Sequence, residues 1–77
     1  MSINTPVCDG IAAAPGRYLL RRWLETAKAQ PDYHTRGLDI EHIKGYLDCL
    51  DDLKVITDSE WKATRAELQQ LLAEVLA

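Results

Sequence analysis

Hydrophobic residues recur every three or four positions along three stretches of the chain, which is the period of an α-helix with one face in a core. The stretches cover residues 15–29, 39–53 and 58–76. Pro15 suits the first position of a helix, where its missing N–H has no partner to lose, and Pro31 ends the first stretch. The pattern therefore predicts an all-α domain built as a three-helix bundle.

Each predicted helix has an apolar arc for the core and a polar arc for solvent. The arcs indicate amphipathic helices that bury one side against each other. The apolar arcs consist of Leu19, Leu20, Trp23, Leu24 and Ala27 in the first helix, Ile40, Ile43, Tyr46, Leu47, Leu50 and Leu53 in the second, and Trp61, Thr64, Leu68, Leu71, Leu72 and Val75 in the third.

Residues that cap helix N-termini precede two of the stretches. Asp39 has the side chain to cap the second helix. Thr57 and Glu60 have the spacing of a capping box, in which each side chain accepts a hydrogen bond from an otherwise unpaired backbone N–H. Ile56 and Trp61 flank that box as a hydrophobic staple would. The start of the third helix is therefore the clearest local signal in the chain.

The connections between the stretches predict how the helices are arranged. Residues 54–56 alone separate the second and third helices, which should pack as an antiparallel hairpin with the first helix over its open side. Residues 30–38 have the composition of a loop. Residues 1–14 lack a sustained period, and Pro6 and Gly10 would interrupt a helix. We therefore expect an irregular N-terminal segment followed by one helical domain over residues 15–77.

Size and charge limit the function that this domain can have. The chain has 77 residues and a net charge of −3, with five basic and three acidic residues before position 39 and four basic and nine acidic residues from there on. An acidic second half argues against docking on nucleic acid or on an anionic membrane. A core of this size is worth roughly 3–5 kcal/mol, so self-association is a plausible source of further stability.

Few residues of the sequence suggest catalysis, a metal or a cofactor. Cys8, Cys49, His34 and His42 lack the spacing of a zinc site. Cys49 and His42 lie two helical turns apart, roughly 10 Å, which is too far for direct proton transfer. We therefore expect no enzyme, no metal and no cofactor. Two cysteines without a disulfide framework, no apolar run of membrane length and no basic start to a signal peptide predict a cytoplasmic protein without a membrane span.

One segment resembles a known family of helical hairpins. The segment contains Leu47-x-x-Leu50, then Val55-Ile56-Thr57-Asp58-Ser59-Glu60-Trp61, then Arg65 and Leu68. It resembles the SHOCT domain, a short hairpin at the C-terminus of many bacterial proteins, although Lys54 stands where that family has glycine. The resemblance covers about a quarter of the chain and implies interaction or oligomerisation.

A second resemblance covers about ten residues. Ile43-Lys44-Gly45-Tyr46, followed by Asp48, Leu50, Asp51 and Asp52, is similar to a segment of a small acidic anti-CRISPR protein of phages. That family blocks a type I-F surveillance complex by occupying its DNA-binding surface. The resemblance implies a phage- or mobile-element-encoded inhibitor of a host complex.

These observations predict a non-enzymatic protein–protein interaction module, cytoplasmic and homodimeric, that binds a protein partner of unknown identity. Its acidic surface would consist of Glu41, Asp48, Asp51 and Asp52, and the anchoring aromatic residues would be Trp23, Tyr33 and Tyr46. The alternative is an accessory protein that binds nucleic acid through the basic first helix and the loop after it. The side chains for that alternative are Arg17, Arg21, Arg22, Lys28 and Arg36. We favour pairing of this basic face with acidic residues of the second helix, in the same chain or in a second copy.

Overall fold

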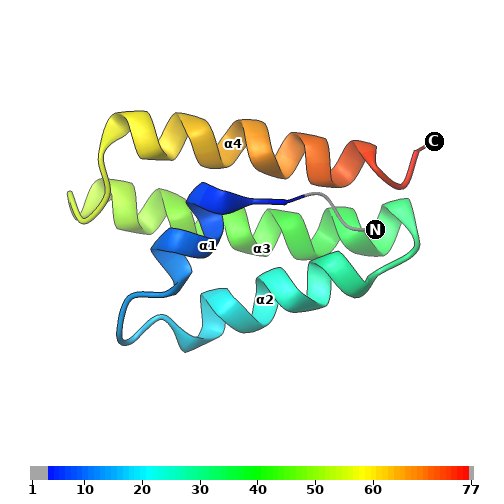
Figure 1. Ribbon diagram of the computed structural model, residues 1–77, viewed down its shortest axis with the longest axis horizontal. Coiled ribbons are helices and arrows are strands. Elements are labelled where there is room, and N and C mark those ends of the chain that lie inside the picture. The colour runs from blue at the N-terminus through cyan, green and yellow to red at the C-terminus, as the bar shows by residue number, and fades with distance from the viewer. Residues whose placement is uncertain (1–3, 77) are drawn as a thin grey trace.

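The computed structural model describes residues 4–76, which form four helices and, within that range, no strand (Figure 1). The helices are α1 (Pro6–Ala12), α2 (Tyr18–Ala29), α3 (Tyr33–Asp52) and α4 (Asp58–Ala73). Helices α2, α3 and α4 lie side by side with α3 in the middle, and α1 crosses one face of that layer. The all-α class is confirmed, and so is the packing of α3 against both α2 and α4.

Helix α1 was not predicted, and the expectation of an irregular segment over residues 1–14 is wrong for this part of it; residues 1–3 lie outside the described residues. Pro6 occupies the first turn, where a missing N–H costs nothing. Cys8, Ile11 and Ala12 are buried against the rest of the protein. A helix of seven residues is too short to be stable alone, so this burial is what holds it in place.

Helix α2 begins later than predicted. Pro15 and Gly16 lie in a turn, where Gly16 has a φ of 83°, and the helix starts only at Tyr18. Its end at residue 29 agrees with the prediction. Leu20 is fully buried, whereas Leu19 is 51% exposed. Successive helical residues point about 100° apart, so the two leucines cannot both face α3.

Helix α3 begins earlier than predicted. Its cap is Asp32, whose carboxylate accepts a hydrogen bond from Thr35 N at 3.0 Å, and not Asp39. The assignment of residues 30–38 to a loop is therefore wrong from Tyr33 onward. The composition of this stretch indicated a loop because it contains glycine and short polar side chains, which an N-terminal turn also tolerates.

The start of α4 confirms the predicted capping box. Thr57 Oγ1 accepts a hydrogen bond from Glu60 N at 3.0 Å, and Glu60 Oε1 accepts one from Thr57 N at 2.8 Å. Two orphan N–H groups of the first turn are thereby satisfied. The helix itself ends at Ala73, three residues before the predicted boundary.

The turn between α3 and α4 is a Schellman motif. Val55 N donates to Leu50 O at 2.9 Å and Lys54 N donates to Asp51 O at 3.0 Å, which are the two bonds that define this motif. Lys54 occupies the left-handed position with a φ of 60°. Lysine thus adopts the conformation for which glycine is preferred, and the predicted antiparallel hairpin forms without that glycine (Figure 1).

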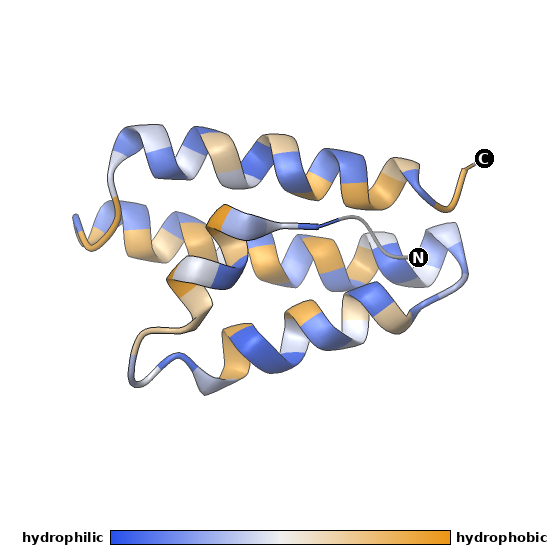
Figure 2. Ribbon diagram, viewed as in Figure 1, coloured by the Kyte–Doolittle hydropathy of each residue, from blue (hydrophilic) through white to orange (hydrophobic). Residues whose placement is uncertain are grey.

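The core lies where the apolar arcs of α2, α3 and α4 meet beneath α1 (Figure 2). Most of the predicted arc residues are buried or half-buried, but Leu53 is 66% exposed because it follows the last turn of α3. The buried hydrophobic residues are Cys8, Ile11, Ala12, Leu20, Leu24, Ala27, Ile40, Ile43, Leu47, Ile56, Leu68 and Leu71. Among the described residues, no helix has the length and apolar character needed to cross a bilayer.

Candidate interaction surface

The guanidinium of Arg36 is buried where α2 ends, α3 begins and α4 ends. Its Nε donates to Gln30 O at 3.0 Å and its Nη2 donates to Lys28 O at 3.0 Å. Its Nη1 donates to Leu71 O at 2.9 Å and to the Glu74 carboxylate at 2.6 Å. Arg36 was predicted as a loop residue that contacts nucleic acid, and that prediction is wrong because the side chain is only 3% exposed.

Two further predicted phosphate contacts serve the end of α1 instead. Arg17 Nη1 donates to Ile11 O at 2.9 Å, and Arg21 Nη1 donates to Ala12 O at 2.7 Å and to Ala14 O at 3.3 Å. These carbonyl groups lie at the end of α1 or just after it, where few helical N–H groups remain to pair with them, and arginine side chains commonly donate to such groups. The two guanidinium groups therefore fasten α1 to α2.

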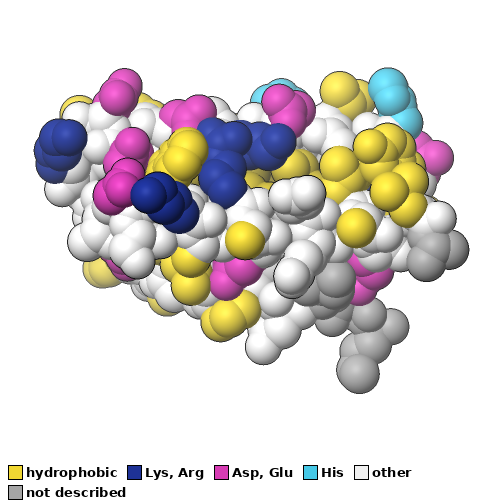
Figure 3. Space-filling model, turned by 90° about the horizontal axis from the view of Figure 1, so that it is seen from above, with side chains coloured by type: hydrophobic (Ala, Val, Ile, Leu, Met, Phe, Trp, Pro, Cys, Tyr) yellow, Lys and Arg dark blue, Asp and Glu magenta, His cyan; other side chains and the backbone are white. Residues whose placement is uncertain are grey.

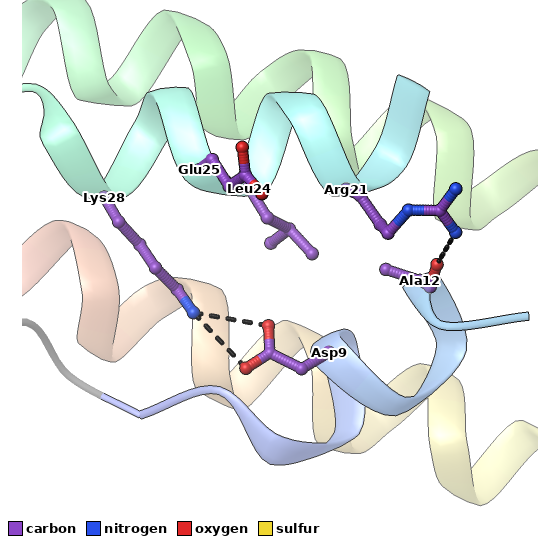
Figure 4. Close-up of a pocket in the computed structure, with 6 residues that line it drawn as sticks. All are labelled: Asp9, Ala12, Arg21, Leu24, Glu25 and Lys28. Atoms are coloured by element: carbon purple, nitrogen blue, oxygen red, sulfur yellow. Dashed lines mark hydrogen bonds and ion pairs between the residues drawn. The ribbon is translucent and has the colours of Figure 1, made fainter. Parts of the chain in front are cut away.

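Lys28 completes the attachment of α1. Its Nζ lies 3.2 Å from one carboxylate oxygen of Asp9 and 3.4 Å from the other (Figure 4). The two residues line a pocket of about 200 Å³, whose other walls are Ala12, Arg21, Leu24 and Glu25. This volume is below the range of about 300–1,000 Å³ that is usual for ligand sites. The pocket is a seam between α1 and α2 in which the charges of Lys28 and Asp9 satisfy one another.

The basic face of α2 thus pairs mainly with α1. The expectation that it pairs with acidic residues of the next long helix is not met among the described residues, because α1 supplies Asp9 and two backbone carbonyls and Ala14 supplies a third. Arg22 is exposed, and it is the one of the five predicted nucleic-acid contacts whose side chain has neither a hydrogen bond nor an ion pair within the described part of the chain.

Asp48, from the predicted acidic surface, is engaged by α4. Its carboxylate accepts a hydrogen bond from Trp61 Nε1 at 2.9 Å and forms an ion pair with Arg65. The Arg65 guanidinium also lies over the Trp61 ring, 4.8 Å from its centroid. The hydrogen bonds from Arg65 and Trp61 hold the pKa of the Asp48 carboxyl below its ordinary value. This carboxylate belongs to a contact between α3 and α4.

The other predicted acidic residues differ in whether their carboxylates are paired within the chain. Glu41 forms an exposed ion pair with Lys44 at 3.0 Å. Asp51 and Asp52 lie in the last turn of α3, and no ion pair or side-chain hydrogen bond to either is found among the described residues. The acidic surface that remains available to a partner is therefore centred on the C-terminal end of α3.

The three predicted aromatic anchors do not converge. Trp23 is half-buried and packs against two rings of α3: its centroid is 6.1 Å from that of Tyr46 in an edge-on arrangement and 5.6 Å from that of His42. Tyr33 is 46% exposed at the first residue of α3, far along that helix from its acidic end. Two of the predicted anchors thus help to pack α2 on α3.

Glu67 has a role that the sequence did not reveal. Its carboxylate accepts hydrogen bonds from Val7 N at 2.8 Å and Cys8 N at 2.9 Å, and so caps the N-terminus of α1 from α4. Burial and the neighbouring Glu67 carboxylate raise the pKa of the Cys8 thiol, which makes it a poor nucleophile. Sixty positions separate Val7 from Glu67, so no local pattern could have linked them.

The remaining candidates for chemistry stay apart. Cys49 is exposed and free, while Cys8 is free and buried. Over residues 4–76, no group of three or more His, Cys, Asp or Glu side chains is placed to hold a metal ion. Comparisons with protein-family models, with curated proteins and with solved structures found no match to this chain.

Proposed function

We propose that this chain is a non-enzymatic protein–protein interaction module that binds a basic partner through the acidic end of α3. The observation that carries the proposal is the use of basic side chains inside the fold. Seven of the nine basic residues are hydrogen-bonded or ion-paired within the chain: Arg17, Arg21, Lys28, Arg36, Lys44, Lys62 and Arg65.

Among the described residues, this internal use of cations leaves three unpaired carboxylates against two unpaired cations, Arg22 and Lys54, in a chain whose net charge is −3. Glu25, Asp51 and Asp52 have neither a cationic partner nor a hydrogen bond from a side chain among the described residues. Potentials of this sign attract basic surfaces and repel phosphates. The more specific form of the proposal is an inhibitor encoded by a phage or mobile element, acting in the cytoplasm on a host complex. We also propose that the chain forms homodimers.

The nucleic-acid alternative receives less support, because it needs guanidinium and ammonium groups that are occupied. Arg36 is buried, and Arg17, Arg21 and Lys28 hold α1. A mobility-shift assay with DNA and RNA at low salt is its direct test. A shift that is lost on Arg22→Glu and weakened by salt would favour the alternative.

Affinity purification from the native host tests the leading proposal. A tagged wild-type chain should retain a protein that a variant carrying Asp51→Lys and Asp52→Lys does not retain. Glu25→Lys is the matched control, since it reverses an exposed carboxylate on α2. Equal retention by all three chains, or retention of nucleic acid alone, would contradict the proposal.

A further inference from the structure

The turn that joins α3 to α4 contains several residues whose charge or conformation is unfavourable for the stability of the fold. We call residues 51–55 the hairpin tip. Asp51 and Asp52 place two carboxylates at the negative end of the α3 dipole, and no basic residue lies in that last turn. Each such placement costs about 0.3–1 kcal/mol. Lysine or asparagine at these two positions would stabilise this end of the helix relative to aspartate.

The backbone and the apolar side chains of the hairpin tip follow the same trend. Lys54 adopts a φ of 60°, a conformation that costs a side chain about 1–2 kcal/mol and that glycine adopts freely. Leu53 and Val55, on either side of it, are 66% and 48% exposed. The two Schellman hydrogen bonds hold them in a fixed geometry. The tip therefore presents two apolar side chains on an ordered turn.

Two other helix starts follow the rules that the hairpin tip breaks, whereas α2 has Arg17 at its N-cap without a side-chain hydrogen bond and α4 has no basic residue in its last turn. Asp32 caps α3, and the capping box starts α4 with Asp58 and Glu60 near its positive end. The buried Arg36 satisfies carbonyls at the ends of α2 and α4. Sequences that obey local preferences elsewhere tend to depart from them where a function requires it. At the hairpin tip, unlike those helix ends, unpaired carboxylates, a strained backbone and exposed apolar side chains occur together within residues 51–55, and this combination points to a contact with another molecule.

We propose that the hairpin tip docks a basic amphipathic segment of a partner protein. An apolar side chain of that segment would cover Leu53 and Val55, and flanking Lys or Arg side chains would pair with Asp51 and Asp52. The choice of occupant follows from charge: the carboxylates of Asp51 and Asp52 have no cationic partner among the described residues, and the tip holds one basic residue, Lys54. A second copy of the chain would bring the same negative charge to the tip and be repelled. Nucleic acid and anionic membranes are also negatively charged and would be repelled in the same way. This proposal rests on the proposed function and specifies the chemistry of the partner, which is a basic amphipathic segment.

A peptide titration followed by NMR tests the hairpin tip directly. The probe is a synthetic helical peptide of about 14 residues with leucine at every third or fourth position and lysine or arginine elsewhere. Its matched control carries glutamate in place of the basic residues. Amide shifts of the labelled full chain should centre on residues 50–56 with the basic peptide and be absent with the acidic one.

Two double variants separate the charged and the apolar contributions. Asp51→Asn with Asp52→Asn, and Leu53→Ser with Val55→Ser, should each weaken the binding at least tenfold. The matched controls are Glu25→Gln, which removes an exposed carboxylate elsewhere, and Leu76→Ser, which changes a leucine that is 65% exposed, close to the 66% of Leu53. These controls should bind as the wild type does.

Stability measurements exclude a trivial loss of fold. The Asp51→Asn, Asp52→Asn variant should be at least as resistant to urea as the wild type, because it relieves an unfavourable helix end. Loss of binding with unchanged or increased stability supports the proposal. Shifts that centre on other residues, binding that survives both double variants, or no binding of the basic peptide at millimolar concentration would overturn it. The proposed function would still be supported, independently of the peptide, by a host protein that the wild type retains and the Asp51→Lys, Asp52→Lys variant loses.

Discussion

A guanidinium inside a protein core needs a partner for almost every N–H, because an unpaired buried charge costs several kcal/mol. Arg36 meets this need with hydrogen bonds to three backbone carbonyls and one carboxylate. Two of those carbonyls, of Lys28 and Leu71, belong to the last turns of different helices. One side chain therefore ties the end of α2 and the end of α4 to the start of α3.

Replacing Arg36 with methionine should destabilise the protein strongly. The aliphatic part of the side chain is kept, but the carbonyl groups and Glu74 lose their donor, so we expect a loss of roughly 3 kcal/mol in the free energy of unfolding. Urea denaturation followed by circular dichroism measures it. Glu74→Gln is the control and should cost only about 1 kcal/mol, because the Glu74 side chain is 22% exposed. A methionine variant as stable as the wild type would show that the hydrogen bonds of Arg36 are dispensable.

Asp48 should make the stability depend on acidity. Arg65 and Trp61 hold its pKa in the folded state below the ordinary 3.8, so the unfolded chain binds the proton more readily. Its contribution is complete above about pH 5 and is lost as the pH falls through the folded-state pKa. The difference in unfolding free energy between wild type and Asp48→Asn should therefore be constant near neutrality and shrink in acid. A difference that stays constant in acid would contradict this role of Asp48.

At the scale of single residues, the sequence predicted the polar role of Asp48 only in part and missed that of Arg36 entirely. The acidic arc of α3 was visible, but its contact with Arg65 depends on how α4 packs. Arg36 was assigned to solvent because charged residues are rarely buried. Its acceptors are backbone carbonyls, which carry no sequence identity, so nothing in the residues of α2 or α4 marks them as its partners.

Helix α1 is held by contacts at its two ends as well as by the burial of its inner side. Glu67 holds its N-terminus, while Arg17 and Arg21 hold its C-terminus. Its inner side buries Cys8 completely. The accessibility of that thiol therefore reports whether α1 is docked.

Replacing Glu67 with alanine should release α1 without unfolding the rest. The two amide N–H groups at its start lose their acceptor, which we expect to cost about 1–2 kcal/mol of docking free energy and to speed labelling of Cys8 by roughly tenfold or more. The measurement uses a thiol reagent in a Cys49→Ser background, because Cys49 is exposed. Gln70→Ala changes an exposed residue of the same helix and should leave the rate unchanged. If the labelling of Cys8 in the Glu67 variant is as slow as in the wild type, apolar packing alone docks α1.

The turn between α3 and α4 can be improved by one substitution. Lys54→Gly should raise the free energy of unfolding by about 1 kcal/mol, because glycine adopts the left-handed conformation without strain. For a domain of this size that corresponds to roughly 4–8 °C in melting temperature. Lys54→Ala removes the charge but keeps the strain, so it should give no such gain. An equal gain in both variants would assign the effect to charge instead of conformation.

The elements were predictable where their signals are local. The capping box of Thr57 and Glu60 fixed the start of α4, and Pro31 fixed the end of α2. Two other local signals have a meaning that differs from the predicted one: Pro6, expected to interrupt a helix, occupies the first turn of α1, and Asp32 caps α3 in place of Asp39. The bounds of α1 and α3 were thus accessible from sequence, whereas the docking of α1 was not, because it depends on long-range hydrogen bonds.

On the scale of the whole molecule, exposed apolar side chains occur at both ends of the bundle. The hairpin tip is at one end. At the other end, where α3 begins and α4 finishes, Leu38 and Leu76 are 53% and 65% exposed beside the half-buried Leu72 and Val75. Figure 3 shows hydrophobic side chains gathered at this end of the face. Because we assign the hairpin tip to a basic partner, the leucines of this second group are among the exposed apolar side chains that remain for a contact between copies.

We therefore expect the homodimer to form through the end that carries Leu38 and Leu76. A core of this size leaves a small margin of stability, and covering exposed leucines in a dimer adds to it in proportion to the logarithm of concentration. Sedimentation equilibrium at tens of micromolar should give the mass of a dimer for the wild type and of a monomer for the Leu38→Ser, Leu76→Ser variant. Leu53→Ser with Val55→Ser should stay dimeric, since the hairpin tip is left for the basic partner. A wild-type chain that is monomeric throughout this range would contradict the proposed homodimer. A dimer that is lost only when Leu53 and Val55 are changed would place self-association at the hairpin tip, where we expect a different protein to bind.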